Sequence, residues 1–200
     1  MIRTYKYKLY KTKKLNHIHR TINIAGIIYN HCIALHKRYY KLYGKSLNKF
    51  QLQKHLTKLK KRDKYSYWNK LGSQAIQNIT ERIDEGYKKF YKKQGGLPSF
   101  KKVSKYKSFT LKGKIGYKLE DNIISLNGYK YKFWKSRPID GTIKTVIVKR
   151  DNIGDFYICI TIEKENPKYS VTSGKTVGID FGLIKFLSLS DKTEIESPLF

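Results

Sequence analysis

The chain has 200 residues, and its 43 Lys and Arg against 15 Asp and Glu give it a formal net charge of +28. A charge of this size attracts polyanions over long distances, and the pI of about 10.0 is far from that of an ordinary cytosolic enzyme. The chain also has 17 Tyr, nine Phe and two Trp. Cations neutralise phosphate and aromatic rings stack on unpaired bases, so the composition indicates a nucleic-acid partner. A ribosomal-type protein would share this composition, which therefore gives only the class of partner.

Cysteine usage and the absence of long apolar runs suggest a cellular compartment. Cys32 and Cys159 are far apart and neither belongs to a C-x-x-C pair, so we expect no zinc site and no disulfide framework. The basic N-terminus lacks the apolar region of a signal peptide, and no apolar run approaches membrane-spanning length. We therefore expect a cytoplasmic, nucleoid-associated protein that does not contact a membrane.

The first predicted element is a strand from Arg3 to Tyr10, in which apolar and basic residues alternate. Its aromatic face ends at Leu9, and its basic face carries Lys6 and Lys8. The pattern fits a solvated amphipathic strand, and it equally fits a strand whose basic face lies along phosphates.

A long helix is predicted next, over residues 14–43. Apolar residues recur at spacings of three and four from Leu15 to Leu42, and Gly44 is a natural stop. The opposite face of this helix is polar and basic and includes Arg38.

Further helices are predicted up to residue 93, which together make a small helical bundle. Ser46 is a plausible N-cap for the second helix, and Ser73 for the last one. A basic run closes the second helix, and its Lys60 and Lys61 either stabilise the helix C-terminus or meet phosphate.

From Phe100 the hydrophobic period changes to two, which indicates short strands. Asn127-Gly128 is the strongest local hairpin signal in the chain. The expected strands are 105–111, 115–119, 123–126, 129–133, 142–150 and 156–163. Strands so closely spaced suggest a small antiparallel β-barrel, which the opening strand would join. The fold class expected is therefore α+β, with the helical bundle inserted into the barrel.

A last hairpin is predicted around a single acid, Asp180. Apolar residues alternate there with glycine and this acid over residues 177–182, and a second strand follows over 186–190. An RNase H-like nuclease sheet begins in this way. Its chemistry needs several carboxylates to hold two Mg²⁺ ions roughly 3.5–4 Å apart around a phosphodiester.

Two other interpretations of Asp180 stay open at this point. Sugar-kinase and actin-type ATPases also begin with such a strand, but the bulky turn at residues 183–185 argues against a phosphate cradle. Asp180 could equally be a buried acid that is hydrogen-bonded to a turn.

Four stretches in this order resemble the N-terminal half of the TnpB family, the OrfB-type transposon-encoded proteins related to type V CRISPR effectors. The stretches are YKYKLYKT from Tyr5, Tyr29-Asn30, QAIQNITERIDEGYKKFYKKQGGLPSFKK from Gln74 with Ser108-Phe109-Thr110 after it, and VGIDFGL from Val177. The chain departs from the family pattern at Lys11, where a proline is usual, at Ser99, where an arginine is usual, and near Gly86, where an alanine is usual.

The resemblance implies a role for each part of the chain. Residues 1–12 and 100–168 would form a wedge-like, oligonucleotide-binding barrel, 13–99 an inserted recognition domain, and 169–200 a linker and the start of a RuvC-like nuclease domain. Guide RNA and DNA would be the partners, with base pairing reading most of the sequence. Lys101 and Lys102, at the end of the family's Gly-x-Pro-x-Phe-Lys loop, would contact nucleic acid. Asp180 would be the first catalytic carboxylate and a Mg²⁺ ligand.

The family's nuclease also needs a later glutamate, a second aspartate and a zinc ribbon, which the 200 residues do not contain. We therefore expect a truncated, transposon-associated RNA-guided DNA endonuclease whose Asp180 site is incomplete and inactive alone. One alternative is half of a split nuclease, completed by a second polypeptide; Mg²⁺ would bind only in the completed site. Another is a non-catalytic RNA- or DNA-binding regulatory protein.

Overall fold

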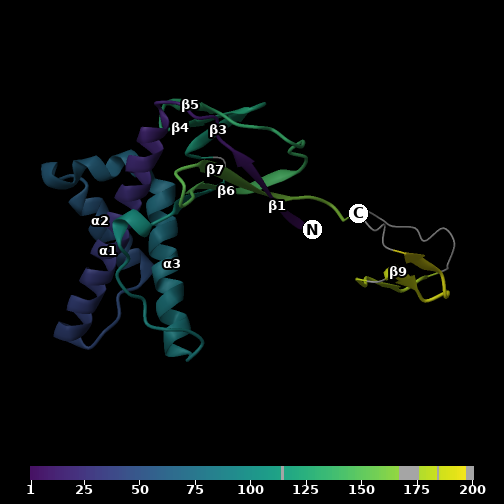
Figure 1. Ribbon diagram of the computed structural model, residues 1–200. Coiled ribbons are helices and arrows are strands. Elements are labelled where there is room, and N and C mark those ends of the chain that lie inside the picture. The colour runs from purple at the N-terminus through teal and green to yellow at the C-terminus, as the bar shows by residue number, and fades with distance from the viewer. Residues whose placement is uncertain (114, 167–175, 184, 197–200) are drawn as a thin grey trace. The chain divides into compact units, whose positions relative to one another are not determined.

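The computed structural model describes residues 1–113, 115–166, 176–183 and 185–196. It divides into two compact units, Met1–Glu165 and Asn166–Phe200, each of which is described by itself. In the first unit, helices flank one side of two antiparallel sheets (Figure 1).

The larger sheet of the first unit has four antiparallel strands in the order β1-β7-β6-β2. The strands are β1 (Ile2–Lys8), β2 (Ser108–Lys112), β6 (Thr142–Arg150) and β7 (Phe156–Glu163). The bounds predicted for β6 and β7 are confirmed. In β7 the even-numbered residues from Phe156 to Ile162 are buried, as their alternation predicts.

The smaller sheet has three strands, β3 (Tyr117–Glu120), β4 (Ile123–Leu126) and β5 (Tyr129–Lys132). The predicted hairpin at Asn127-Gly128 joins β4 to β5 and is confirmed. Both turn residues have positive φ, 48° at Asn127 and 83° at Gly128, which is the backbone of the tight turn that Asn-Gly favours.

The prediction of a closed β-barrel is wrong. In the described part of the chain the two sheets are joined only where β1 ends, by a bridge between Leu9 and Phe133. There Tyr10 N donates to Lys132 O at 3.0 Å, and Trp134 N donates to Lys8 O at 2.9 Å. A barrel needs every strand hydrogen-bonded to a neighbour on both sides. Here no ladder joins β2 to the smaller sheet among the described residues, so the architecture is mixed α+β with open antiparallel sheets.

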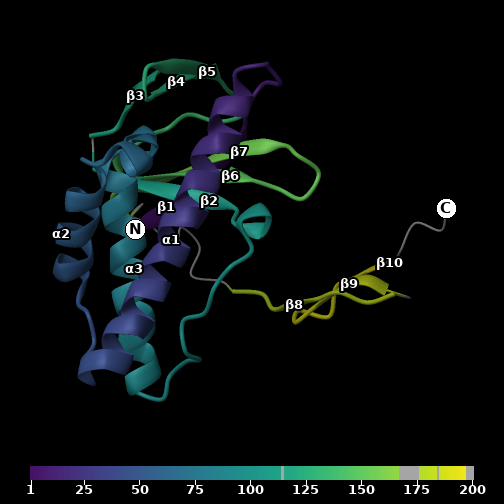
Figure 2. The ribbon, with the colours of Figure 1, turned by 90° about the vertical axis from the view of Figure 1, so that its left-hand side faces the viewer.

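The helical segment lies between β1 and β2 in the chain and contains α1 (Leu15–Tyr43), α2 (Lys49–Leu59), the 3₁₀ helix η1 (Asp63–Leu71) and α3 (Ser73–Tyr91). The long predicted helix is confirmed, and Gly44 ends it in the left-handed conformation. In Figure 2 the three α-helices lie side by side, and α3 also packs against β2. None of the helices in the described ranges is long and apolar enough to cross a membrane.

Two predicted helix caps are wrong. Asn48, not Ser46, caps α2: its side chain accepts from Gln51 N at 3.0 Å, and the Gln51 side chain accepts from Asn48 N at 2.9 Å. This reciprocal capping box satisfies two backbone donors, whereas Ser46 Oγ pairs with the Tyr91 hydroxyl. Ser73 is the first residue of α3, because the preceding Gly72 turns the chain with a φ of 83°.

Cys32 packs in the core of the first unit, as its position on the apolar face of α1 predicts. It is fully buried, and burial raises the pKa of its thiol to about 12. A thiol that stays protonated in an apolar core is chemically inert.

Arg150, at the end of β6, is a buried charge that sequence patterns do not reveal. It is only 5% exposed, and its guanidinium donates to the carbonyls of Tyr106 and Val103, both at 3.0 Å, and of Ser104 at 3.3 Å. Nη1 also lies 3.0 Å from His19 Nδ1. Burial lowers the pKa of this guanidinium. Arg150 therefore fastens the segment before β2 to β6 and α1.

We expect acid to destabilise the fold as the pH falls below about 6.5. All five histidines have a pKa lowered from 6.5, first by burial. The unfolded chain therefore binds more protons below pH 6.5, so stability is fully present above that pH and is lost as pH falls through the folded pKa values. Urea unfolding at pH 7.5, 6.5 and 5.5 measures the effect, and the free energy of unfolding should be lower at pH 5.5 than at pH 6.5 or 7.5.

Four carboxylates titrate below this window, because a hydrogen bond from a lysine lowers the pKa of each one. They are those of Asp121, Asp140, Asp155 and Glu163. His31 and His55, whose Nε2 atoms are 3.1 Å apart, resist double protonation, so His55→Gln should flatten the pH dependence. Equal stability at all three pH values would contradict the prediction.

In the second unit, β8 (Ile179–Asp180), β9 (Lys185–Leu189) and β10 (Glu194–Glu196) form a sheet in the order β10-β9-β8. The predicted hairpin is confirmed by the antiparallel pairing of β8 with β9. The strand β10 was not predicted, because its two glutamates fit a solvated polar segment and not a strand.

Candidate nucleic-acid interface

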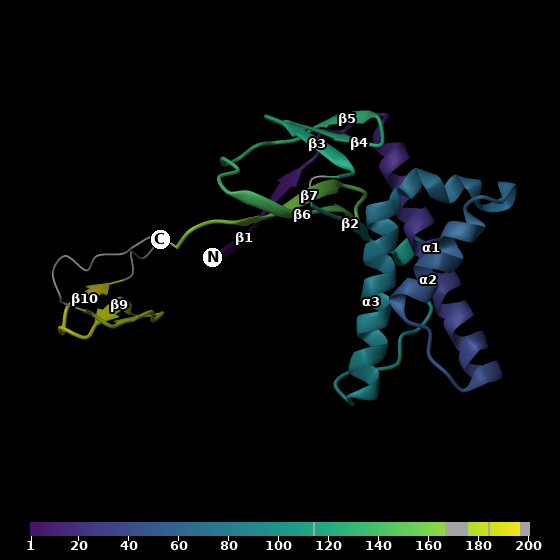
Figure 3. The same cartoon turned by 180° about the vertical axis from the view of Figure 1, so that it is seen from behind.

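A polar groove lies where the start of α1, the end of η1 and the β4–β5 hairpin meet. We call it the hairpin groove; it has a volume of about 370 Å³ and is lined by His17, Arg20, Thr21, Ile24, Asn69, Lys70, Asn127 and Tyr129. Figure 3 shows the start of α1 beside β4 and β5. The groove exists only because the chain brings segments more than 100 residues apart to one place.

Specific contacts fix the walls of the hairpin groove. The rings of His17 and Tyr129 stack with centroids 4.1 Å apart, and His17 Nδ1 lies 3.0 Å from the Tyr131 hydroxyl. Asn127 Nδ2 donates to Lys70 O at 2.7 Å. The hairpin turn is therefore held on both α1 and η1, which makes the groove a preformed feature of the fold.

The hairpin groove is electropositive. Its lining includes the exposed Arg20 and Lys70 and no acidic residue. Burial lowers the pKa of His17, and the nearby charges of Lys70 and Arg20 lower it further. A neutral histidine between two cations, with amide groups beside it, suits an anionic ligand that also accepts and donates hydrogen bonds.

A second hollow continues the basic surface on the other side of the hairpin turn. It shares Asn127 with the hairpin groove and is lined also by Lys118, Ser125 and Lys130. These three residues face one another in register across β3, β4 and β5, so they lie in one row on one face of the sheet. The opposite face of the sheet carries the buried Ile124 and Tyr131. The outer face is thus free to contact phosphates.

A stacked aromatic pair, the half-buried Tyr10 and the exposed Trp134, lies just beyond the ends of β1 and β5. The rings of Tyr10 and Trp134 stack with centroids 4.7 Å apart, and Trp134 is 60% exposed. Lys132 Nζ lies 5.7 Å from the Tyr10 ring. Stacked rings beside a cation suit an unpaired base with its phosphate.

The basic residues predicted to bind nucleic acid lie on four segments of the chain. Lys6 and Lys8 are on β1, Arg38 is on α1, Lys60 and Lys61 follow α2, and Lys101 and Lys102 precede β2. None of them lines the hairpin groove. Their role as contacts stays a prediction.

Some of these predicted cations are partly engaged within the protein. Lys8 pairs with Asp155 at 2.5 Å, and the Lys6 ammonium lies 4.0 Å from the centre of the Tyr157 ring. Lys101 Nζ lies 5.0 Å from the Tyr29 ring, and burial lowers its pKa. The backbone of Lys101 is held by Asn30, which donates to its carbonyl at 2.8 Å and accepts from its N–H at 2.9 Å.

Asp180 lies on β8 opposite Ser188 and is exposed to solvent. The interpretation of Asp180 as a buried acid is therefore wrong, because its neighbours Ile179 and Phe181 are exposed as well. No group of three or more His, Cys, Asp or Glu in the described ranges could hold a metal ion. The acidic residues of the described second unit thus do not fit a two-Mg²⁺ centre. Part of the turn after Asp180, at residue 184, lies outside the described residues.

Sequence patterns missed the hairpin groove because its residues are far apart in the chain. In the sequence, Asn127 is recognisable only as a turn residue, and Lys70 lies in no segment with a helical or strand period. The available signal was the basic and polar face of α1, which includes His17 and Arg20.

Comparisons with known proteins show what the chain is similar to. No protein-family model matches it. It is 30% identical over 125 residues to InsQ, a candidate RNA-guided DNA endonuclease of Escherichia coli strain K12; the match covers 62% of this chain and 31% of InsQ. The chain thus spans about a third of this curated relative. The similarity confirms the predicted resemblance to the TnpB family.

Among solved structures, the chain is similar to a CRISPR-Cas12f ternary complex with a TM-score of 0.51 and 13% identity, covering 92% of this chain and 49% of that one. A Cas12f1 complex with single-guide RNA and target DNA gives a TM-score of 0.47 and 15% identity, covering 98% and 57%. The first of these likenesses shows that the fold is Cas12f-like.

Proposed function

We propose that this TnpB-like chain binds RNA and DNA as the nucleic-acid-holding part of an RNA-guided DNA endonuclease system. The observation that carries the proposal is the hairpin groove, a preformed basic groove without an acidic lining residue. The relative InsQ is named as a candidate RNA-guided DNA endonuclease, which agrees with this chemistry.

In this proposal the protein reads shape and charge, and base pairing reads sequence. Arg20 and Lys70 in the groove, with Lys118 and Lys130 beyond the hairpin turn, contact phosphates. Asn69 and Asn127 can hydrogen-bond to sugar hydroxyls or base edges. The stacked Tyr10 and Trp134 accept an unpaired base.

Asp180 is proposed as a position of the nuclease centre that needs further carboxylates. One carboxylate cannot hold two Mg²⁺ ions, so the other ligands would come from outside the described residues, on this polypeptide or a second one. Asp180→Ala should abolish any cleavage by the completed system and leave nucleic-acid binding unchanged.

A second candidate function is a non-catalytic RNA- or DNA-binding regulator. The observation that favours it is that the hairpin groove and the aromatic pair lie wholly within the first unit and do not involve Asp180. Under this function, Asp180→Ala would be silent in every assay.

Binding should depend strongly on salt, because phosphate contacts release counterions. The four basic residues at the groove and beyond the turn predict a slope of log affinity against log salt of about −3 or steeper. Fluorescence anisotropy with a labelled RNA hairpin from 50 to 300 mM KCl measures it. A nearly flat affinity over this range would rule out the basic surface as the binding site.

A further inference from the structure

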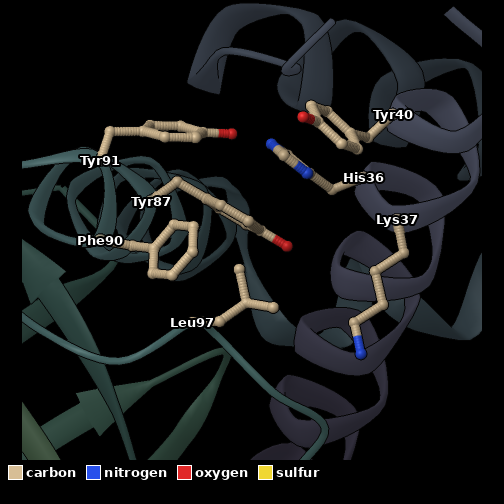
Figure 4. Close-up of a pocket in the computed structure, with 7 residues that line it drawn as sticks. All are labelled: His36, Lys37, Tyr40, Tyr87, Phe90, Tyr91 and Leu97. Atoms are coloured by element: carbon tan, nitrogen blue, oxygen red, sulfur yellow. The ribbon is translucent and has the colours of Figure 1, made fainter. Parts of the chain in front are cut away.

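An aromatic pocket, separate from the hairpin groove, lies at the ends of α1 and α3 that point away from the sheets (Figures 1 and 4). It has a volume of about 400 Å³ and is lined by His36, Lys37, Tyr40, Tyr87, Phe90, Tyr91 and Leu97. Nothing in the function proposed above uses these residues.

Flat rings form most of the pocket. The rings of His36 and Tyr87 stack with centroids 3.6 Å apart and an angle of 11° between them. Figure 4 shows the imidazole of His36 between Tyr40 and Tyr87, with the ring of Tyr91 beside them. Tyr40 and Tyr91 are each 53% exposed, so their faces remain available to a ligand. Such a setting suits a flat ring that enters from solvent and stacks.

Two buried polar atoms in the pocket have no hydrogen-bond partner. They are His36 Nε2 and the Tyr87 hydroxyl, on side chains that are only 2% and 5% exposed. Figure 4 shows the Tyr87 hydroxyl directed toward the space between Leu97 and Lys37. Buried polar groups are normally paired, so these two atoms indicate a ligand that brings donors and acceptors with it.

The segments that flank the pocket are strongly basic. Residues 37–49 contain five Lys and Arg and no acid, and residues 87–102 contain six Lys and no acid. A ligand that is flat, carries hydrogen-bonding edges and is attached to a negative charge matches all three observations. An unpaired nucleotide has this chemistry.

We propose that the aromatic pocket holds one unpaired nucleobase from a single-stranded segment of the bound nucleic acid. The base stacks on Tyr40 or Tyr91, its edge pairs with the Tyr87 hydroxyl or His36 Nε2, and the adjoining phosphate lies near Lys37. A second copy of the chain is a poor occupant, because two surfaces of this charge repel each other. The proposal rests on the nucleic-acid-binding function proposed above.

Alanine variants at the rim of the pocket test the proposal. Tyr40→Ala and Phe90→Ala remove exposed or half-exposed rings, so the chain should still fold. The matched control is Tyr43→Ala, which removes an exposed tyrosine of α1 that does not line the pocket. Each pocket variant should bind a single-stranded 12-mer RNA about tenfold more weakly, whereas the control stays within twofold of wild type. Affinity for a blunt DNA duplex should be unchanged by all three.

A crosslink gives a direct readout of the same site. The 12-mer with 5-iodouracil at successive positions, irradiated on the wild-type chain, should attach to a peptide that contains Tyr40, Tyr87 or Tyr91. The proposal fails if the wild type binds RNA and the pocket variants bind it as tightly as Tyr43→Ala does. It also fails if the wild type is a dimer that the pocket variants disrupt while they keep their affinity for RNA. If the wild type binds neither RNA nor duplex, the proposed function itself fails.

Discussion

Replacing Arg150 by methionine lowers the free energy of unfolding by about 3–4 kcal/mol. The guanidinium satisfies three backbone carbonyls of residues 103–106, and methionine fills a similar volume but donates no hydrogen bond. The carbonyl of the buried Tyr106 would lose its donor, whereas the Val103 carbonyl keeps a bond from Tyr106 N at 3.1 Å. A carbonyl left unpaired where water cannot reach it costs about 1–3 kcal/mol. Urea unfolding followed by circular dichroism measures the loss.

The control for Arg150 is Arg62→Met. Arg62 is exposed and precedes η1, and the same substitution there should change stability by less than about 0.5 kcal/mol. Arg150→Lys keeps the charge but lacks the planar fork, so it should recover only part of the loss. An Arg150→Met chain within 1 kcal/mol of wild type would contradict the structural role of this side chain.

Removing the positive charge of the hairpin groove should weaken RNA binding by roughly 100-fold at 150 mM salt. The variant carries Gln at Arg20, Lys70, Lys118 and Lys130, the four cations around the hairpin turn. These side chains are exposed, so the fold should persist. The slope of log affinity against log salt should also become shallower by about 3, because fewer counterions are released. Anisotropy titrations at several salt concentrations measure both effects.

A matched variant separates the site from the overall charge. Gln at the exposed Lys54, Lys58, Lys64 and Lys105 removes four charges elsewhere, so both variants have a formal net charge of 28 − 4 = +24. The matched variant should lose less than about fivefold. Equal losses in the two variants would mean that the general field, not the groove, binds nucleic acid.

Local signals in the sequence predicted much of the fold. The strand period sets the bounds of β6 and β7, and Asn127-Gly128 has the positive φ angles of its tight turn. The prediction of the barrel failed because tertiary contacts decide how the strands are arranged. Whether the strands close into a barrel depends on how the two sheets meet, and among the described residues they meet only at the bridge between Leu9 and Phe133.

The same division applies to the candidate sites. A basic composition predicts the class of partner, but it does not show which basic side chains lie together in one site. Lys8 is partly neutralised by Asp155, while Lys70 lies beside Asn127, which donates to its carbonyl, in the lining of a groove that only the folded chain creates. Likewise, the unpaired polar atoms of His36 and Tyr87 become visible only in the structure.

The most direct test of the central claim is to purify the chain from the cells that encode it and to sequence the nucleic acid that it carries. We expect one discrete, structured RNA, encoded beside the gene, and we expect the four-glutamine variant of the hairpin groove to lose it. A random mixture of RNA and DNA, carried equally by the wild type and the variant, would contradict guided binding. It would leave the net charge of +28 as the only basis for the interaction.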